Sequence, residues 1–175
     1  RKTKNPSVLE VRLDYAQIPP CFLPEENSIS RFREYILSVL THLKGFIPAL
    51  RFDFSSFAVS GCDGLAALTE LMNAASAMDY YIILDAPEIL SPASAQLVAD
   101  GLFGEASLFK CNAAVISSYL GSDGWKPFLS YCEKHDKDIF VTVRTGNKSA
   151  PELQDLLAGS RVVHAAAADH VNRYG

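Results

Sequence analysis

The sequence YYIILDAPEILSPAS, at Tyr80–Ser94, is the strongest indication of the fold. An apolar run ends in the carboxylate of Asp85, and a proline-containing loop and a helix start come after it. A nearly unbroken apolar run is typical of a strand buried on both faces of a parallel sheet. Parallel α/β folds carry their chemistry at the carboxyl ends of such strands. We therefore expect a parallel strand over Tyr80–Ala86 and a functional site beside Asp85.

Outward from this stretch, strand patterns alternate with helix patterns. Strands are expected at Ser7–Leu13, Pro48–Phe54, Ala113–Ser117 and Asp138–Thr145. Helices are expected from an Asn27 or Ser28 cap to Leu43, from an Asp63 cap to Ala77, and over Pro92–Leu102, Gly121–Lys134, Pro151–Leu157 and Val162–Arg173. This alternation predicts a parallel sheet with right-handed crossovers. Periodicity alone leaves two architectures open, an open doubly wound sheet and an incomplete (β/α)8 barrel.

Composition sets the class of protein. The chain has 175 residues, of which 49% are hydrophobic and 21% charged, so it can bury the core of a single domain. Its net charge of -4 argues against nucleic acid as a partner, because phosphate binding needs clustered Lys and Arg. No apolar run approaches the ~20 residues that a membrane helix needs. The four cysteines form no CxxC pair, so we expect free thiols, no metal site and a reducing, cytoplasmic location.

Several blocks of the chain resemble a known family. They are SYLGSDGWKPFL (118–129), KDIFVTVRTGNKSAPELQDL (137–156) and AAADHVNRYG (166–175), with PALRFDF (48–54) upstream. Together they resemble orotidine 5′-phosphate decarboxylase of the long bacterial type over nearly the whole chain. The resemblance implies a (β/α)8 barrel, usually a dimer. That family converts orotidine monophosphate to uridine monophosphate and CO2 without a cofactor or metal, so we expect neither here.

The resemblance also implies a charged catalytic array, which this sequence keeps only in part. Asp85 matches the first aspartate of the family's D-x-K-x-x-D pattern, but Pro87 stands at the lysine position and Leu90 at the second aspartate. Arg51 stands where the family has a strand-two lysine. In that chemistry a carboxylate disfavours the substrate's charged ground state, while a lysine stabilises the carbanion and supplies its proton. Proline has no protonatable group, so Asp85 and Arg51 are predicted to be inactive remnants.

Four further positions are candidate ligand-binding residues. Arg12 or Asp14 stands at the ribose-binding position, and the register of the first strand leaves both open. Thr145 and Asn147 remain from the family's pyrimidine-contacting block, in which Gly146 replaces a serine. A purely structural interpretation competes with each role: Asp85 could cap the following loop, and Arg51 could pair with a neighbouring carboxylate.

By resemblance, residues 1–175 form one domain that corresponds to strands one to five of the barrel and lacks strands six to eight. The residues leave open whether the remaining part is missing from this sequence, supplied by another chain or lost. Such a portion has open sheet edges, which we expect a homodimer or another chain to cover. The prediction is thus a non-catalytic decarboxylase-like protein that acts through protein contacts. Two alternatives stay open: an active decarboxylase with a rearranged site, and a nucleotide- or anion-binding module that binds a pyrimidine nucleotide weakly without turnover.

Overall fold

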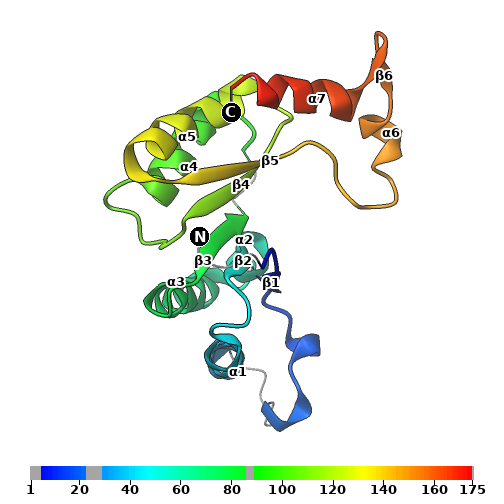
Figure 1. Cartoon of the computed structure of the whole chain (residues 1–175). Helices are drawn as coiled ribbons and strands as arrows, with labels where there is room; N and C mark the ends of the chain where they lie inside the picture. Colours follow the sequence, from blue (N-terminus) through cyan, green and yellow to red (C-terminus); the bar gives the residue numbers. More distant parts are fainter. Residues whose placement is uncertain (1–4, 23–28, 86–88, 175) are drawn as a thin grey trace.

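The computed structural model describes residues 5–22, 29–85 and 89–174, and Figure 1 shows the chain in sequence colours. One parallel sheet has the strand order β1-β2-β3-β4-β5, which is also the chain order. Its strands are β1 Val8–Val11, β2 Ala49–Asp53, β3 Tyr81–Asp85, β4 Ala113–Ser117 and β5 Asp138–Thr142. The α-helices are α1 Ile29–Leu43, α2 Phe54–Ala58, α3 Gly61–Ala77, α4 Pro92–Phe103, α5 Ser122–His135, α6 Pro151–Gln154 and α7 Val163–Asn172. Short 3-10 turns at Tyr15–Gln17 and Pro20–Phe22 follow β1.

The strand order decides between the two architectures that periodicity left open. A doubly wound sheet reverses its strand order at a switch point, and its helices then cover both faces. Here the order runs one way through five parallel strands, so right-handed crossovers place the connecting helices on the same face. The chain therefore has the arrangement of part of a (β/α)8 barrel, as expected.

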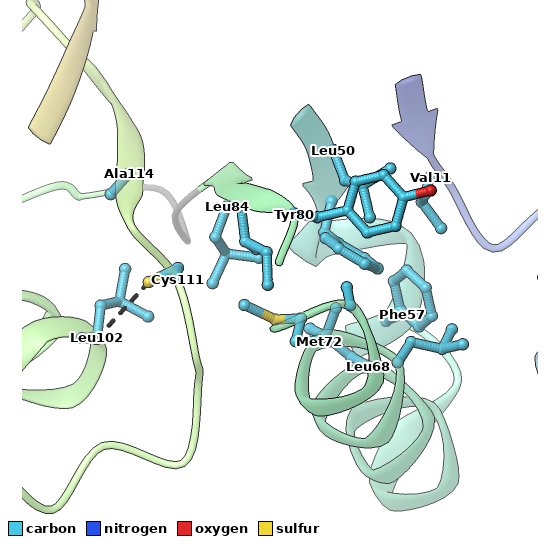
Figure 2. Close-up of a cluster of buried hydrophobic side chains, with 14 of the residues drawn as sticks. Val11, Leu50, Phe57, Leu68, Met72, Tyr80, Leu84, Leu102, Cys111 and Ala114 are labelled. Atoms are coloured by element: carbon cyan, nitrogen blue, oxygen red, sulfur yellow. Dashed lines mark hydrogen bonds between the residues drawn. The ribbon is translucent and has the colours of Figure 1, made fainter. Parts of the chain in front are cut away.

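Side chains alternate strictly between the two faces of this sheet. Leu50, Phe52, Ile82 and Leu84 are fully buried on the face that carries the helices. Figure 2 shows Leu50 and Leu84 above α3, whose Leu68 and Met72 point up toward the strands. We call the opposite side the open face. Phe140 of β5 points to it and is 49% exposed.

Local chemistry explains where the central elements begin and end. β3 stops at Asp85, and α4 starts at Pro92, where the missing N–H of proline costs no hydrogen bond. The Ser91 hydroxyl caps α4 by accepting from Ser94 N at 3.1 Å. Gly45, just beyond α1, has φ +86°, a conformation that glycine adopts without strain.

Several of the expected boundaries were wrong, and the strand expected over Asp138–Thr145, for example, ends at Thr142. The strand predicted to reach Phe54 ends at Asp53, because the Asp53 carboxylate accepts from Ser55 N and Ser56 N and starts the unpredicted helix α2. Asp63 does not cap α3, which begins two residues earlier, and lies instead in its first turn. The expected caps Asn27 and Ser28 lie outside the described residues.

The predicted helix Pro151–Leu157 was also too long. α6 ends at Gln154, and an antiparallel hairpin of β6 (Leu157–Ala158) and β7 (Arg161–Val162) follows. Gly159 at the tip has φ +69°, which the helical spacing of the neighbouring leucines did not reveal. All four cysteines are free thiols, as expected.

Candidate functional site

The candidate site lies on the open face, at the carboxyl ends of β1, β2 and β3. Strand register pairs Glu10 with Arg51 and Asp53 with Asp85. Alternate residues share a face, so Arg12 lies on the same side as Glu10. We call these five residues, Glu10, Arg12, Arg51, Asp53 and Asp85, the charged cluster.

The central contact of the cluster joins Arg51 to Asp85. The guanidinium donates from Nε to Oδ1 at 2.9 Å and from Nη2 to Oδ2 at 2.5 Å, so both carboxylate oxygens are engaged. The two side chains are 42% and 24% exposed. The hydrogen bond to Asp85 raises the pKa of Arg51 above its ordinary value, partial burial opposes that rise, and the nearby carboxylates reinforce it. Arg51 is therefore a permanent cation that cannot act as a proton donor.

Arg12 extends the cluster toward β1. Its Nε lies 3.2 Å from Oδ2 of Asp53, and its Nη2 donates to Oε1 of Glu10 at 3.1 Å. Glu10 also lies 3.9 Å from Nη1 of Arg51. Each charge in the cluster thus has an opposite charge beside it. The cluster contains one more carboxylate than guanidinium groups, so it offers no excess positive charge to a phosphate.

The cluster has no lysine among the described residues. Lys137, between α5 and β5, instead donates from Nζ to the carbonyl of Cys111 at 2.7 Å. Pro87, at the position that the resemblance gives to the catalytic lysine, lies outside the described residues. Leu90 stands at the second aspartate position and is 75% exposed. The described cluster therefore consists of carboxylates and guanidinium groups and contains no lysine amine.

The other candidate ligand residues have local partners. Asp14 caps the 3-10 turn after β1, accepting from Ala16 N at 3.0 Å and from Gln17 Nε2 at 2.9 Å. The Thr145 hydroxyl receives a hydrogen bond from Gln154 Nε2 at 2.7 Å and donates to Oδ1 of Asn147 at 2.5 Å. The structure thus unites Arg12, Arg51 and Asp85 but gives Asp14, Thr145 and Asn147 separate hydrogen-bond partners.

Sequence reasoning did not single out Glu10 or Asp53 as site residues. Both complete the charged cluster, and alternation could have found them, since each lies two positions from another charged residue of its strand. The structural interpretation of Arg51, pairing with a neighbouring carboxylate, agrees with the geometry. Asp85 pairs with Arg51 rather than serving only as a cap.

The described part of the chain contains neither a candidate metal-binding cluster nor a candidate membrane-spanning helix. Within residues 5–22, 29–85 and 89–174, no three His, Cys, Asp or Glu side chains gather closely enough to hold a metal ion. None of the helices there is both long and apolar enough to cross a bilayer.

Fold and site together define an α/β protein with a barrel-type parallel sheet and charged side chains at the carboxyl ends of its strands. No family model matches the chain. Among curated proteins, the orotidine 5′-phosphate decarboxylase of Caldicellulosiruptor bescii is 27% identical over 192 aligned positions, which cover 99% of this chain and 63% of the relative. That of Rhodopirellula baltica is 24% identical over 151 positions, covering 84% of this chain and 50% of the relative.

Solved structures agree with the sequence relatives. The orotidine monophosphate decarboxylase of Leishmania donovani superposes with a TM-score of 0.72 at 26% identity, covering 93% of this chain and 58% of that one. The chain is a homologue of the orotidine 5′-phosphate decarboxylases over most of its length. It spans between 50% and 63% of the length of these curated relatives.

Proposed function

We propose that this chain is a non-catalytic homologue of orotidine 5′-phosphate decarboxylase that acts through protein contacts in the cytoplasm. The observation that supports this most is the Arg51–Asp85 pair, in which the guanidinium occupies both oxygens of the carboxylate. In the chemistry that the resemblance implies, this carboxylate must face the carboxylate of the substrate. The guanidinium of Arg51 compensates the charge of Asp85, which weakens the repulsion that Asp85 can exert on a second carboxylate.

The missing proton donor supports the same proposal. Decarboxylation leaves a carbanion, which needs a nearby cation and then a proton. Arg51 supplies a charge, but the raised pKa of its guanidinium keeps its proton bound at neutral pH. Position 87 is a proline, which carries no titratable group at all. Neither position can therefore complete the reaction.

The open face supports the part of the proposal that concerns protein contacts. β1 and β5 are the two edge strands of the described sheet, and Val8 and Phe140 on these strands are 47% and 49% exposed. Unpaired strand edges and exposed apolar side chains are typical of surfaces that another polypeptide covers. A second copy of this chain or a different chain could cover these edges. Light scattering on the 19.1 kDa chain distinguishes a monomer from an assembly.

The decisive test places residues 1–175 into the decarboxylase of Caldicellulosiruptor bescii, in place of the matching part. This chimera supplies whatever the relative carries beyond the match, so lost turnover reports on the charged cluster rather than on missing length. We expect no release of CO2 from orotidine monophosphate. The triple substitution Arg51→Lys, Pro87→Lys and Leu90→Asp should then give measurable turnover. The unmodified relative is the positive control, and circular dichroism checks that each chimera folds.

Turnover by the unsubstituted chimera would contradict the proposal and favour an active decarboxylase with a rearranged site. The nucleotide-binding alternative has a separate test, in which uridine monophosphate is added to the chain during thermal unfolding. A ligand at 100 times its Kd stabilises the folded state by about 2.7 kcal/mol. We expect no such shift, because the guanidinium groups of Arg12 and Arg51 are already paired with carboxylates.

A further inference from the structure

Residues 146–174, which we call the C-terminal segment, are attached to the rest of the molecule mainly through polar and aromatic contacts. They contain α6, the β6–β7 hairpin and α7, shown in orange and red in Figure 1. Ala150, at 2% exposure, is their one buried residue. α7 contains no buried residue, whereas α3 and α4 each contribute several to the core. Apolar burial therefore contributes little to holding this segment in place.

Polar contacts around one carboxylate replace that burial. Asp155, directly after α6, accepts from Arg144 Nε at Oδ1 and from Arg144 Nη2 at Oδ2, both at 3.0 Å. His164, at the start of α7, places Nδ1 3.0 Å from the same Oδ1. Arg144 follows β5, so Asp155 connects the end of the sheet, the end of α6 and the beginning of α7. All three side chains are between 31% and 40% exposed, which leaves these contacts open to water and salt.

A second pair of hydrogen bonds runs parallel to the first. Thr145 N donates to Oε1 of Gln154 at 2.7 Å, and Gln154 Nε2 donates back to the Thr145 hydroxyl at 2.7 Å. Gln154 and Asp155 are adjacent, so both sets of contacts join the same short turn to the strand end. Loss of one set weakens the geometry of the other.

The far end of the segment rests on Trp125 of α5. His170 and Tyr174 place their rings 5.6 Å and 6.4 Å from the indole ring, both edge-on. Trp125 is 1% exposed, yet within the described residues its Nε1–H has no hydrogen-bond partner. A buried donor without a partner is unfavourable, and water can satisfy it once the cover is removed. The unsatisfied N–H of Trp125 therefore favours exposure of the indole ring to water.

We propose that the C-terminal segment is a hinged flap, closed by Asp155, that opens as a unit at residues 145–146 and uncovers Trp125 while the five-stranded sheet stays folded. Segments with few buried apolar contacts open locally at lower free energy than the core. Opening carries Asn147 away from Thr145 together with α6. This inference rests on packing alone and does not depend on the proposed function.

Hydrogen exchange of the whole chain tests the proposal first, because it needs no variant. Amides of α7 should exchange at least tenfold faster than those of β2 and β3. Asp155→Asn should then increase exchange in α6 and α7 by a further factor of five or more, with β2 and β3 unchanged. Trp125 is the chain's one tryptophan, so acrylamide quenching of its fluorescence should rise in the same variant.

Glu34→Gln is the matched control. Glu34 accepts from Arg31 at 2.8 Å in an exposed pair on α1, far along the chain from the segment. It should change neither quenching nor exchange in α7. Equal exchange rates in α7 and β3 of the unsubstituted chain would overturn the proposal, as would an Asp155→Asn variant in which all elements lose protection together.

Discussion

The two faces of the sheet differ in the kind of side chain that each carries at the strand ends. On the helix-covered face, Phe52 and Leu84 are fully buried in a continuous apolar core. Arg51 and Asp85, which are adjacent in sequence to Phe52 and Leu84, lie on the open face and form an ion pair that water can reach. The comparison shows that stability and candidate chemistry are separated by the alternation of side chains, so either can change without the other. The predictions below test that separation in order of decreasing expected effect.

The largest effect is expected from Leu84→Ala. Leu84 is 0% exposed and packs over α3, so the substitution leaves a cavity and should lower the free energy of unfolding by about 2–5 kcal/mol. Denaturant unfolding measures this value. Val115→Ala is the matched control on the open face, where the side chain is only half-buried, and should cost much less. Equal losses would show that the open face is covered by a core of its own.

The Arg51–Asp85 pair should contribute less. A double-mutant cycle with Arg51→Met and Asp85→Asn should give a coupling free energy of about 1 kcal/mol, since bidentate geometry favours the pair and solvent screens it. Unfolding of the four proteins in low and high salt measures that coupling. A coupling near zero at low salt would mean that Arg51 leaves Asp85 free in solution.

Asp155 makes stability of the C-terminal segment depend on pH. Its hydrogen bond to Arg144 and the nearby positive charges lower the carboxyl pKa from 3.8, although partial desolvation opposes this. A lowered pKa in the folded state means that the contribution is present above 3.8 and is lost as the pH falls through the folded value. NMR titration should place the Asp155 midpoint below 3.8, with α7 losing exchange protection over the same range. A midpoint at or above 3.8 would contradict the geometry.

The smallest effect concerns the thiols. Burial raises the pKa of the Cys111 thiol to about 11, whereas Cys21 and Cys62 are exposed. Because the thiolate is the reactive form, an alkylating reagent at pH 8 should modify Cys21 and Cys62 while Cys111 remains unmodified. Mass spectrometry of the labelled peptides checks this. Labelling of Cys111 at the rate of Cys62 would show that the β3–β4 region opens readily.

Much of the fold could be predicted because its signals are local. The apolar run before Asp85 gave β3 to within one residue at each end, and Ser91-Pro92 marked the start of α4. The hairpin after α6 was missed because Leu153, Leu156 and Leu157 have helical spacing, yet they are 50–74% exposed. Spacing predicts a helix only where a core exists to bury one face, and none covers these leucines in the described residues.

The chemical groups of the site follow directly from the residue types in the chain. Position 87 is a proline and position 51 an arginine, and no fold can give either the titratable amine of a lysine. The contacts that those groups make, in contrast, depend on how the strands are arranged. Arg51 and Asp85 lie 34 positions apart, and they meet because parallel register places β2 beside β3. Which carboxylate pairs with Arg51 depends on which strands become neighbours. The order of the strands depends in turn on burial of the apolar side chains on the helix-covered face.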